Sequence, residues 1–283
     1  MVIIFVIKDY YLQLLSIIMG KKIAIIGGGN LGTAIAEGLL KSGFCKPADL
    51  IVTKRNIATI SALKEKGVKT ISDNNKAVQS SEIVILAIKP FQVKDVLTAI
   101  SKDLSPSKHI LISVVTGIFI KDIYETVNKK LPVVRAMPNT AIAIQQSMTC
   151  LSSVNASASQ VKMVDDLFCT LGKVAVIEEK LMDAATVLGA CGTAYAMRYI
   201  RANIQGGIEI GFDATVATLI ASQTVKGAAQ LLLEKGAHPE QEIDKVTTPK
   251  GCTIAGLNEM EHQGFSSSLI KGIAASYNKI VEG

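Results

Sequence analysis

The sequence contains no tryptophan and few other aromatic residues. Aromatic residues make up 5% of its 283 residues, whereas hydrophobic residues of all kinds make up 49%. The predicted core therefore consists of Ile, Val, Leu and Ala, and the length allows about two domains. The net charge is +6, but the basic residues form no run and do not alternate with aromatic residues, which argues against nucleic-acid binding. A mildly basic protein suits an anionic small molecule.

Residues that bind metals or form disulfides are also scarce. The five cysteines are an odd number without a C-x-x-C pair, and the three histidines lie far apart. No group of His, Cys and carboxylate residues has the spacing of a metal site. We therefore predict no metal, reduced thiols and a cytoplasmic protein.

The first 19 residues are apolar, but they do not fit a signal peptide or a membrane span. Lys8 and Asp9 interrupt the apolar run, no basic segment precedes it, and no small-residue cleavage site follows it. The run is also short for a bilayer, so we predict no association with a membrane. Met19 stands directly before the first predicted strand. We expect residues 1–19 to be an extension that is unstructured or not translated.

Residues 22–34, Lys-Ile-Ala-Ile-Ile-Gly-Gly-Gly-Asn-Leu-Gly-Thr-Ala, organise the rest of the chain. An apolar run ends in three glycines and is followed by helix-forming residues, as where a buried parallel strand turns into a helix around a phosphate. Gly27 permits the turn, Gly29 lets a ligand approach the backbone, and Gly32 lets the helix pack closely on the strand. The N–H groups at the helix start then face a pyrophosphate. The predicted dinucleotide-binding residues are Gly27, Gly29, Asn30, Leu31 and Gly32.

The second apolar strand, residues 49–53, ends in Lys54-Arg55-Asn56. NAD-binding proteins of this type carry an acidic residue near this point, which binds the ribose 2′-hydroxyl. Two cations pair instead with a 2′-phosphate. We therefore predict that Lys54 and Arg55 bind NADPH, with NADH as a possible substitute. The alternative is a basic turn that faces solvent.

Strands and helices alternate through the first half of the chain. This alternation predicts a Rossmann-like, doubly wound parallel sheet, with a ligand beyond the carboxyl ends of its strands. Pro90 and Pro138 stand at two of these ends, where the ladder no longer needs an N–H group. Further strands are predicted over 68–71, 82–88, 109–115 and 132–135, and helices over 57–66, 75–80, 92–101 and 121–128.

The strands stop after Glu178-Glu179, a pair that we expect to be a solvated junction between domains. We predict an NADP-binding Rossmann domain over 20–178 and a helical dimerisation and substrate domain over 179–283. Asp213 is a predicted N-cap. Helices rich in Ala and Gly and poor in aromatic residues most simply bury their faces against another subunit, although a self-contained bundle is the alternative. The predicted helices cover 182–206, 213–236, 239–245, 254–263 and 267–281.

Residues 247–254 form a loop with Pro and Gly that opens onto a helix. Backbone N–H groups at such a helix start make a second anion site, which suits a substrate carboxylate. The alternative is an ordinary connection between two helices.

Taken together, these motifs resemble pyrroline-5-carboxylate reductase. The resemblance rests on Gly27–Gly32, Ala87–Pro90, Arg135–Thr140 and Pro249–Leu257, in register over nearly all of residues 20–283. It implies reduction of the C=N bond of 1-pyrroline-5-carboxylate to L-proline, the last step of proline biosynthesis, usually with NADPH. It also implies an intertwined homodimer that can assemble further.

The resemblance implies roles for further residues on the cofactor side. Asn74 matches an asparagine near the adenosine ribose. The nicotinamide side is lined by Ala87, Ile88, Lys89 and Pro90.

On the substrate side, the expected catalytic residues are Thr253 and Thr248. Thr253 is expected to hydrogen-bond near the ring nitrogen of the substrate. Thr248 and the backbone of residues 251–253 are expected to hold the carboxylate. The expected substrate-binding residues are Met137, Asn139, Thr248, Gly251, Cys252 and Thr253.

Three segments depart from the usual family pattern. Residues 248–253 replace Ser-Pro-Gly-Gly-Thr-Thr, so that Lys250 stands where glycine is usual. Residues 189–195 replace Ser-Gly-Ser-Gly-Pro-Ala-Tyr, and residues 141–147 replace a segment that commonly contains Pro and Gly. These departures keep two alternatives open: a non-catalytic NADP(H)-binding sensor or partner protein, or another Rossmann oxidoreductase, such as a hydroxyacid dehydrogenase or a deazaflavin-linked NADP reductase.

Overall fold

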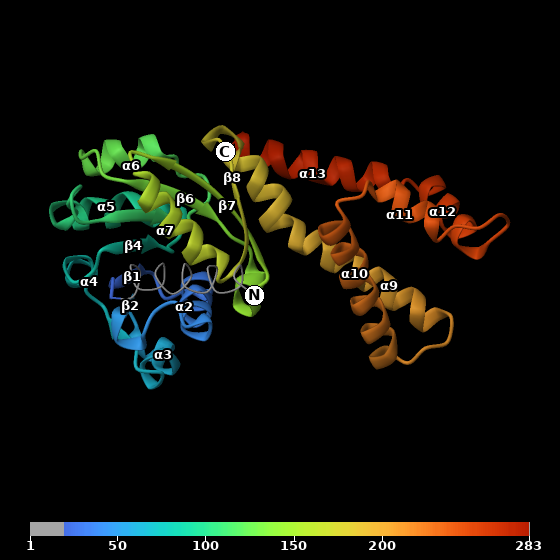
Figure 1. The fold of residues 1–283 in the computed structure, drawn as a ribbon, viewed down its shortest axis with the longest axis horizontal. Coiled ribbons are helices and arrows are strands. Elements are labelled where there is room, and N and C mark those ends of the chain that lie inside the picture. Colours follow the sequence, from blue (N-terminus) through green and yellow to red (C-terminus); the bar gives the residue numbers. More distant parts are fainter. Residues whose placement is uncertain (1–19, 283) are drawn as a thin grey trace, which may run out of the picture. The chain divides into compact units, whose positions relative to one another are not determined.

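A computed structural model describes residues 20–282 of the protein, and the predicted N-terminal extension lies outside this range. The chain divides into two compact units, the first ending at Ala190 and the second beginning at Cys191 (Figure 1). Residues 179–190 are helical, yet they pack with the first unit. The change from strands to helices therefore precedes the division between the units.

An eight-stranded sheet forms the centre of the first unit. Its strands are β1 (Ile23–Ile26), β2 (Leu50–Thr53), β3 (Lys69–Ile71), β4 (Ile83–Leu86), β5 (Ile110–Ser113), β6 (Val133–Met137), β7 (Ser147–Val154) and β8 (Gly172–Val176). Their order is β3-β2-β1-β4-β5-β6-β7-β8. Strands β1 to β6 run parallel, β7 is antiparallel to β6, and β8 is parallel to β7. The order reverses between β1 and β4, which is where such sheets bind ligands.

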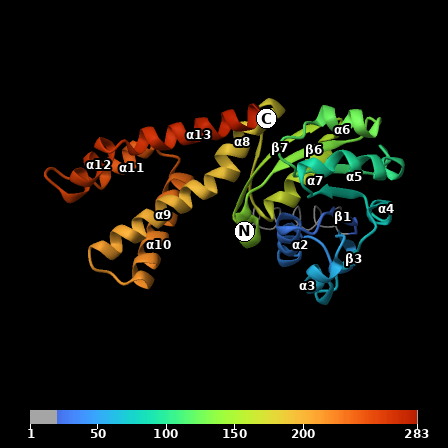
Figure 2. The same ribbon diagram turned by 180° about the vertical axis from the view of Figure 1, so that it is seen from behind.

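Helices cover both faces of this sheet (Figures 1 and 2). They are α2 (Asn30–Ser42), α3 (Ser61–Glu65), α4 (Asn74–Gln79), α5 (Val93–Ile100), α6 (Ile120–Val127), α7 (Ala158–Cys169) and the short α8 (Met182–Ala185). Side chains of α2, α3 and α7 pack on one face, and those of α4, α5 and α6 pack on the other. Because both faces are buried, the central strands are continuous apolar runs. The predicted doubly wound fold is confirmed.

The two faces can be followed along β1, which alternates between the two cores. Ile23 and Ile25 belong to the core under α2, whereas Ala24 and Ile26 belong to the core under α5. All four side chains are at most 1% exposed. The alternation follows from the pleat of a strand, whose side chains point to opposite faces in turn.

Long apolar runs do not predict β7 and β8, which complete the sheet after β6, or the helix α7 between them. Strand β7 alternates in a different way: Ser147, Thr149 and Leu151 are buried, while Met148 and Cys150 between them are partly exposed. The hydroxyl groups of Ser147 and Thr149 lie 3.3 Å apart within hydrogen-bonding distance. A buried strand face that carries hydroxyl groups cannot be recognised by hydrophobicity.

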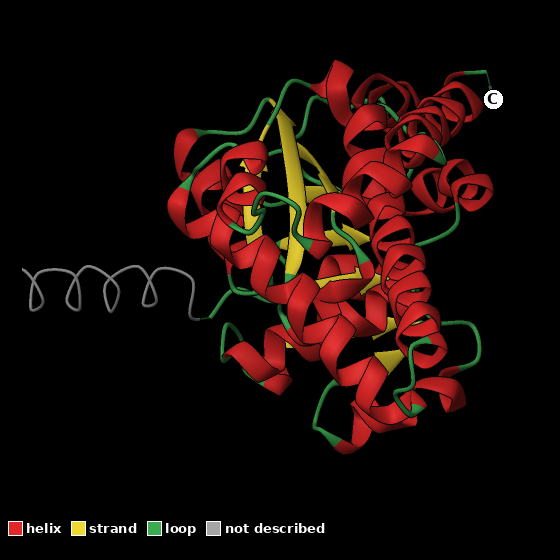
Figure 3. Ribbon diagram, turned by 90° about the vertical axis from the view of Figure 1, so that its right-hand side faces the viewer, coloured by secondary structure: helices red, strands yellow, loops and turns green. Residues whose placement is uncertain are grey.

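The strands, yellow in Figure 3, all precede residue 190, and the second unit is built of helices. These helices are α9 (Gly192–Glu209), α10 (Ala214–Lys235), α11 (Pro239–Lys245), α12 (Cys252–His262) and α13 (Phe265–Val281). The predicted helix over 182–206 consists of α8, a π-helix over Thr186–Cys191, and α9. The predicted cap is confirmed, since the Asp213 carboxylate accepts hydrogen bonds from the N–H groups of Thr215 and Val216 at 2.9 and 3.0 Å.

Helix α10 presents apolar side chains that the rest of residues 20–282 does not cover. Its contact with α9 buries Ala217 and Ala221, whereas Val216, Leu219 and Ile220 remain exposed. By length and composition it is the one described helix that could cross a membrane, and 11% of its apolar window is buried. A helix of this kind needs another apolar surface to cover it.

Candidate functional site

The glycine loop lies where β1 ends and α2 begins. Gly27 has φ +111°, a conformation that residues with a side chain rarely adopt. The N–H groups of Gly27 and Gly28 donate to the carbonyl of Thr53 at 3.2 and 2.7 Å, which joins the loop to the end of β2. Gly29 is the N-cap of α2, and no described side chain caps this helix start. The first N–H groups of α2 therefore have no capping side chain, and helix starts of this kind commonly bind anions.

Close packing explains two of the three spaced glycines. A Cβ atom on Gly27 would lie 2.4 Å from the carbonyl oxygen of Ala87, and one on Gly32 would lie 2.0 Å from that of Gly27. A Cβ atom on Gly29 would meet no described atom within 4 Å. Gly27 and Gly32 are therefore required by the protein backbone, whereas Gly29 faces open space.

A pocket of about 390 Å³ opens beside this loop. It brings together Gly29, Asn30 and Lys54 from the predicted cofactor residues. Arg55 is exposed and lies outside its lining. Glu37 lines the pocket but is paired with Lys66 at 2.6 Å, so its charge is offset. The complete lining is Gly28, Gly29, Asn30, Thr33, Ala34, Glu37, Lys54, Thr59 and Ala143.

Part of the pocket lining could have been predicted from helical spacing in the sequence. Ala34 and Glu37 stand three positions apart on α2, and Thr33 is four positions before Glu37, so that one helix face presents all of them. Ala143 belongs to the 3₁₀ turn Thr140–Ile144, more than a hundred residues from the glycine loop. No local pattern indicates that contact.

Asn74 and the segment Ala87–Pro90 follow the carboxyl ends of two strands of the sheet, β3 and β4. Asn74 begins α4 after β3, is half-buried, and lies outside the lining of the pocket. Ala87 follows β4, and its N–H donates to the carbonyl of Ile26 at 2.9 Å. Lys89 and Pro90 are exposed. Since β1 and β4 are neighbours, Ala87 and Ile88 lie directly beside Gly27.

The end of β6 holds two of the predicted substrate residues. Met137 is buried, and its sulfur lies 3.9 Å from the hydroxyl of Thr116. The Asn139 side chain is occupied by protein partners: Oδ1 accepts from the N–H of Ala141 at 3.0 Å, and Nδ2 donates to the carbonyl of Gly189 at 3.1 Å. The N–H of Asn139 donates to the hydroxyl of Ser147 at 3.1 Å.

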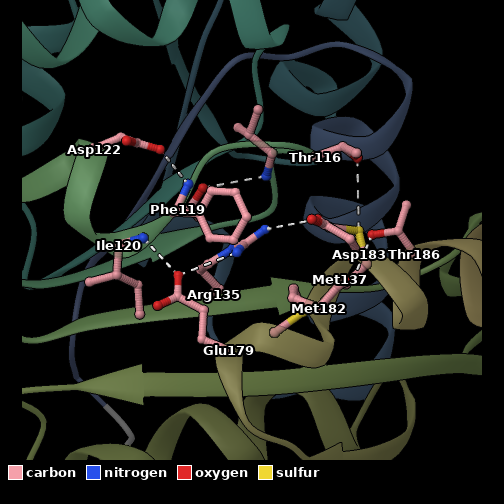
Figure 4. Close-up of polar contacts among 12 residues, drawn as sticks. Thr116, Phe119, Ile120, Asp122, Arg135, Met137, Glu179, Met182, Asp183 and Thr186 are labelled. Carbon is pink, nitrogen blue, oxygen red and sulfur yellow. Dashed lines mark hydrogen bonds and ion pairs between the residues drawn. The ribbon is translucent and has the colours of Figure 1, made fainter. Parts of the chain in front are cut away.

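Arg135 lies at the centre of a polar cluster (Figure 4). Its side chain is 1% exposed, and its Nη1 donates to Glu179 Oε1 at 3.3 Å. Its Nη2 lies 3.9 Å from Asp183 Oδ1, and its guanidinium lies 4.8 Å from the centre of the Phe119 ring. The N–H of Ile120 also donates to Glu179 Oε1, at 2.7 Å. A buried arginine requires such carboxylates, because an unpaired buried charge is strongly unfavourable.

The cluster corrects the expectation for Glu178-Glu179. Glu178 is 69% exposed and pairs with Lys180 at the surface, as expected of a solvated junction. Glu179 is only 26% exposed and pairs with Arg135. The expectation was wrong for Glu179, because a carboxylate next to a domain junction looks solvated until the arginine that it pairs with is found 44 residues away.

The loop over 248–253 lies in the second unit, at the start of α12. The N–H of Gly251 donates to the carbonyl of Thr248 at 2.9 Å, which closes a turn with Lys250 at φ +62°. A Cβ atom on Gly251 would lie 2.5 Å from the Thr248 hydroxyl. Gly251 is the N-cap of α12, and no described side chain caps it. Within the single chain, Thr248, Cys252 and Thr253 are exposed.

Two family models match the chain. One, described as pyrroline-5-carboxylate reductase dimerisation, matches residues 179–283. The other, described as NADP oxidoreductase coenzyme F420-dependent, matches residues 22–117. Pyrroline-5-carboxylate reductase 2 of Dictyostelium discoideum is 44% identical over 275 residues, which cover 92% of this chain and 92% of that protein. The chain belongs to the pyrroline-5-carboxylate reductase family.

Two further relatives support membership of this family. Pyrroline-5-carboxylate reductase 1 of the same organism is 49% identical over 269 residues. These cover 91% of this chain and 49% of that protein, so the chain spans about half the length of this relative. The crystal structure of Plasmodium falciparum pyrroline carboxylate reductase with NADP bound is 26% identical and superimposes with a TM-score of 0.83, covering 92% of this chain and 97% of that one.

Membership of the pyrroline-5-carboxylate reductase family makes the chain an oxidoreductase acting on a CH–NH bond with NAD(P). The resemblance inferred from the four motifs is thereby confirmed. No group of three or more His, Cys, Asp and Glu residues in the described part of the chain could hold a metal ion.

Proposed function

We propose that the chain binds NADPH at the glycine loop and reduces 1-pyrroline-5-carboxylate to L-proline. The main support for this cofactor site is the start of α2, which no side chain caps. It lies at the pocket lined by Gly29, Asn30 and Lys54. Backbone N–H groups at a helix start bind a pyrophosphate well. The proposed cofactor contacts are Gly27, Gly29, Asn30, Leu31, Gly32, Lys54, Arg55, Asn74, Ala87, Ile88, Lys89 and Pro90.

The preference for NADPH rests on the charge beside the pocket. Lys54 follows β2 and lines the pocket, where a ribose 2′-phosphate would gain a charge-assisted hydrogen bond. The one carboxylate in the lining, Glu37, is already paired with Lys66. The NADP in the Plasmodium structure and the NADP oxidoreductase family model point the same way. NADH would bind at the same site without the pairing at Lys54.

The second anion site is proposed at the start of α12. The backbone of Gly251, Cys252 and Thr253 would bind the substrate carboxylate, assisted by the Thr248 hydroxyl. The Thr253 hydroxyl would hydrogen-bond near the ring nitrogen. Met137 and Asn139, at the end of β6, complete the proposed set of substrate-side residues.

These residues mainly position the reactants. NADPH supplies a hydride, two electrons and one hydrogen, to the imine carbon, and the protonated ring nitrogen takes the electron pair of the C=N bond. A protonated imine is already electrophilic, so little acid catalysis is required of the protein. Correct orientation of two reactants can lower the activation barrier by about 7–11 kcal/mol.

We further propose a homodimer in which a second copy covers the exposed apolar side of α10. Leu219 and Ile220 are 69% and 46% exposed in the single chain. The dimerisation family model spans this helix. Dimers of this kind can associate further. Light scattering after size-exclusion chromatography measures the mass: a monomer at micromolar concentration would contradict this part of the proposal.

A cytoplasmic location is part of the same proposal. All five cysteines are free, and burial, followed by the nearby Asp49, raises the pKa of Cys45 to about 11. Such a thiol stays protonated and reacts slowly. Fractionation of cells that express the protein would test the location, and enrichment with membranes or in a secreted fraction would contradict it.

The experiment that tests the activity compares turnover with binding. Oxidation of NADPH is followed by its absorbance after addition of 1-pyrroline-5-carboxylate, and NADPH binding is titrated by fluorescence in parallel. Turnover with formation of proline is the expected result. Binding without turnover would favour the alternative of a non-catalytic NADP(H)-binding relative. Turnover with another carboxylate substrate alone would favour a different Rossmann oxidoreductase.

A further inference from the structure

The carboxyl end of β6 is attached to the segment Glu179–Cys191 at two separate points. Arg135 holds the start of this segment through Glu179 and Asp183. Asn139 holds its end through the carbonyl of Gly189. We refer to Arg135, Asn139, Glu179, Asp183 and Gly189 as the β6 clamp.

The first attachment uses a fully buried charge. The Arg135 Nε and Nη2 atoms and Asp183 Oδ1 have no hydrogen-bond partner in residues 20–282. The guanidinium therefore depends on its ion pairs and on the face of the Phe119 ring. A buried charge held in this way is costly to move, because any displacement exposes an uncompensated charge to an apolar core.

The second attachment uses the whole side chain of Asn139. Its oxygen caps the turn Thr140–Ile144, and its nitrogen donates to Gly189. The N–H of the same residue is held by Ser147 on β7. Asn139 thus fixes the relative positions of the β6 end, strand β7 and the segment at Gly189.

Gly189 lies inside the π-helix Thr186–Cys191, which continues directly into α9 at Gly192. A π-helix is rare, and it is frequently found at functional sites. The π-helix Thr186–Cys191 therefore requires contacts with other parts of the protein that stabilise it. The bond from Asn139 supplies a contact at its centre.

We propose that Arg135 and Asn139 are positioning residues for the reaction. They hold the segment Glu179–Cys191, which is followed along the chain by α9 and, later, by the 248–253 loop. The inference rests on the proposed function, since that loop is the proposed carboxylate site. The Asn139 side chain acts in this role through its hydrogen bond to Gly189.

Three variants remove parts of the clamp. Asn139→Ser keeps an N-cap oxygen for Ala141 but cannot reach Gly189, and Asp183→Asn removes the charge that faces Arg135 Nη2. Arg135→Lys keeps the charge and loses the planar guanidinium. The matched control is Asn75→Ser, because Asn75 Nδ2 also donates to a backbone carbonyl, that of Ala99 at 2.9 Å, but in a part of the first unit away from the clamp.

The first readout is hydrogen exchange of the free protein over residues 182–195. Loss of one clamp contact in Asn139→Ser or Asp183→Asn is expected to speed exchange there about five- to tenfold, with no such change in Asn75→Ser. A residue that only touched substrate would not change exchange in the free protein. Unchanged exchange in both Asn139→Ser and Asp183→Asn would overturn the proposal.

The second readout separates substrate handling from cofactor binding. In the same clamp variants, kcat/KM for 1-pyrroline-5-carboxylate is expected to fall about tenfold or more, while the Kd of NADPH stays within twofold. Faster exchange with unchanged kcat/KM would also overturn the positioning role. If the wild-type protein does not turn over 1-pyrroline-5-carboxylate, the proposed function fails, and the exchange measurement still decides whether the clamp holds the segment.

Discussion

The Cβ atom that Gly32 lacks would lie 2.0 Å from the carbonyl oxygen of Gly27. The first turn of α2 thus packs directly on the residue that follows β1, and only a glycine at position 32 allows this contact. The neighbouring Gly29 has no such contact, which separates a packing requirement from a requirement of the ligand. This difference gives the first prediction.

Gly32→Ala is expected to destabilise the protein by about 1–3 kcal/mol and to weaken NADPH binding, because the helix start must move away from Gly27. Gly29→Ala is expected to cost less stability than Gly32→Ala, namely only the difference between Gly and Ala as an N-cap, and to weaken NADPH binding, since its added methyl group meets no described atom within 4 Å. Thermal unfolding and fluorescence titration measure both effects. Equal loss of stability in the two variants would contradict this assignment.

Lys54→Ala is expected to weaken NADPH binding about ten- to a hundredfold and to change NADH binding by less than twofold. The reason is that the proposed partner of Lys54 is the 2′-phosphate, which NADH lacks. Arg55→Ala is the matched control, with a smaller expected effect because Arg55 lies outside the pocket lining. The Kd values of both cofactors for both variants check this. An equal loss of NADH affinity in Lys54→Ala would show that Lys54 does not contact the 2′-phosphate.

Thr253→Ala is expected to lower kcat/KM for 1-pyrroline-5-carboxylate about ten- to a hundredfold through loss of one hydrogen bond to a charged group. Thr253→Ser keeps the hydroxyl and is expected to keep most of the activity. Cys252→Ala keeps the backbone N–H and is expected to be close to wild type. Steady-state kinetics with NADPH at saturation measure the three. Full activity of Thr253→Ala would remove this residue from the mechanism.

Lys250→Gly is expected to stabilise the protein by about 0.5–1 kcal/mol. Lys250 has φ +62°, a conformation that is unfavourable for a residue with a side chain and free of strain for glycine. Denaturant unfolding measures the change. The control is Lys271→Gly within α13, which is expected to destabilise by about 1 kcal/mol because a helix interior disfavours glycine. Loss of stability in Lys250→Gly would show that the lysine side chain contributes more than its backbone costs.

The buried His109 predicts a dependence of stability on pH. Its Nδ1 accepts from the N–H of Ser105 at 2.8 Å. Burial lowers the pKa of His109 from its ordinary 6.5, despite the opposing hydrogen bond to Val78. The unfolded chain therefore binds a proton before the folded chain does, so stability falls as the pH drops below about 6.5.

Replacement of this histidine tests the pH dependence directly. His109→Gln is expected to flatten the change in unfolding free energy between about pH 7 and pH 5.5, where carboxylates contribute little. His262→Gln, at an exposed position, is expected to leave the slope unchanged. An unchanged slope in His109→Gln would exclude this histidine as its source.

Much of the fold could be predicted because its signals are local. A buried parallel strand requires a continuous apolar run, and a strand that turns at once into a helix around an anion requires glycines at fixed spacing. Strand β7 could not be predicted in this way, because its buried face carries the hydroxyl groups of Ser147 and Thr149. Whether these hydroxyl groups are buried depends on neighbouring elements whose positions cannot be inferred from the local sequence.

The same difference separates the candidate sites. The glycine loop and the family could be inferred from the sequence, since each rests on the order of residues within short stretches. The pairing of Glu179 with Arg135 and the bond from Asn139 to Gly189 became visible in the folded structure, because they join residues 44 and 50 positions apart. Buried charges and amides find their partners through the packing of whole elements, and no local pattern encodes that choice.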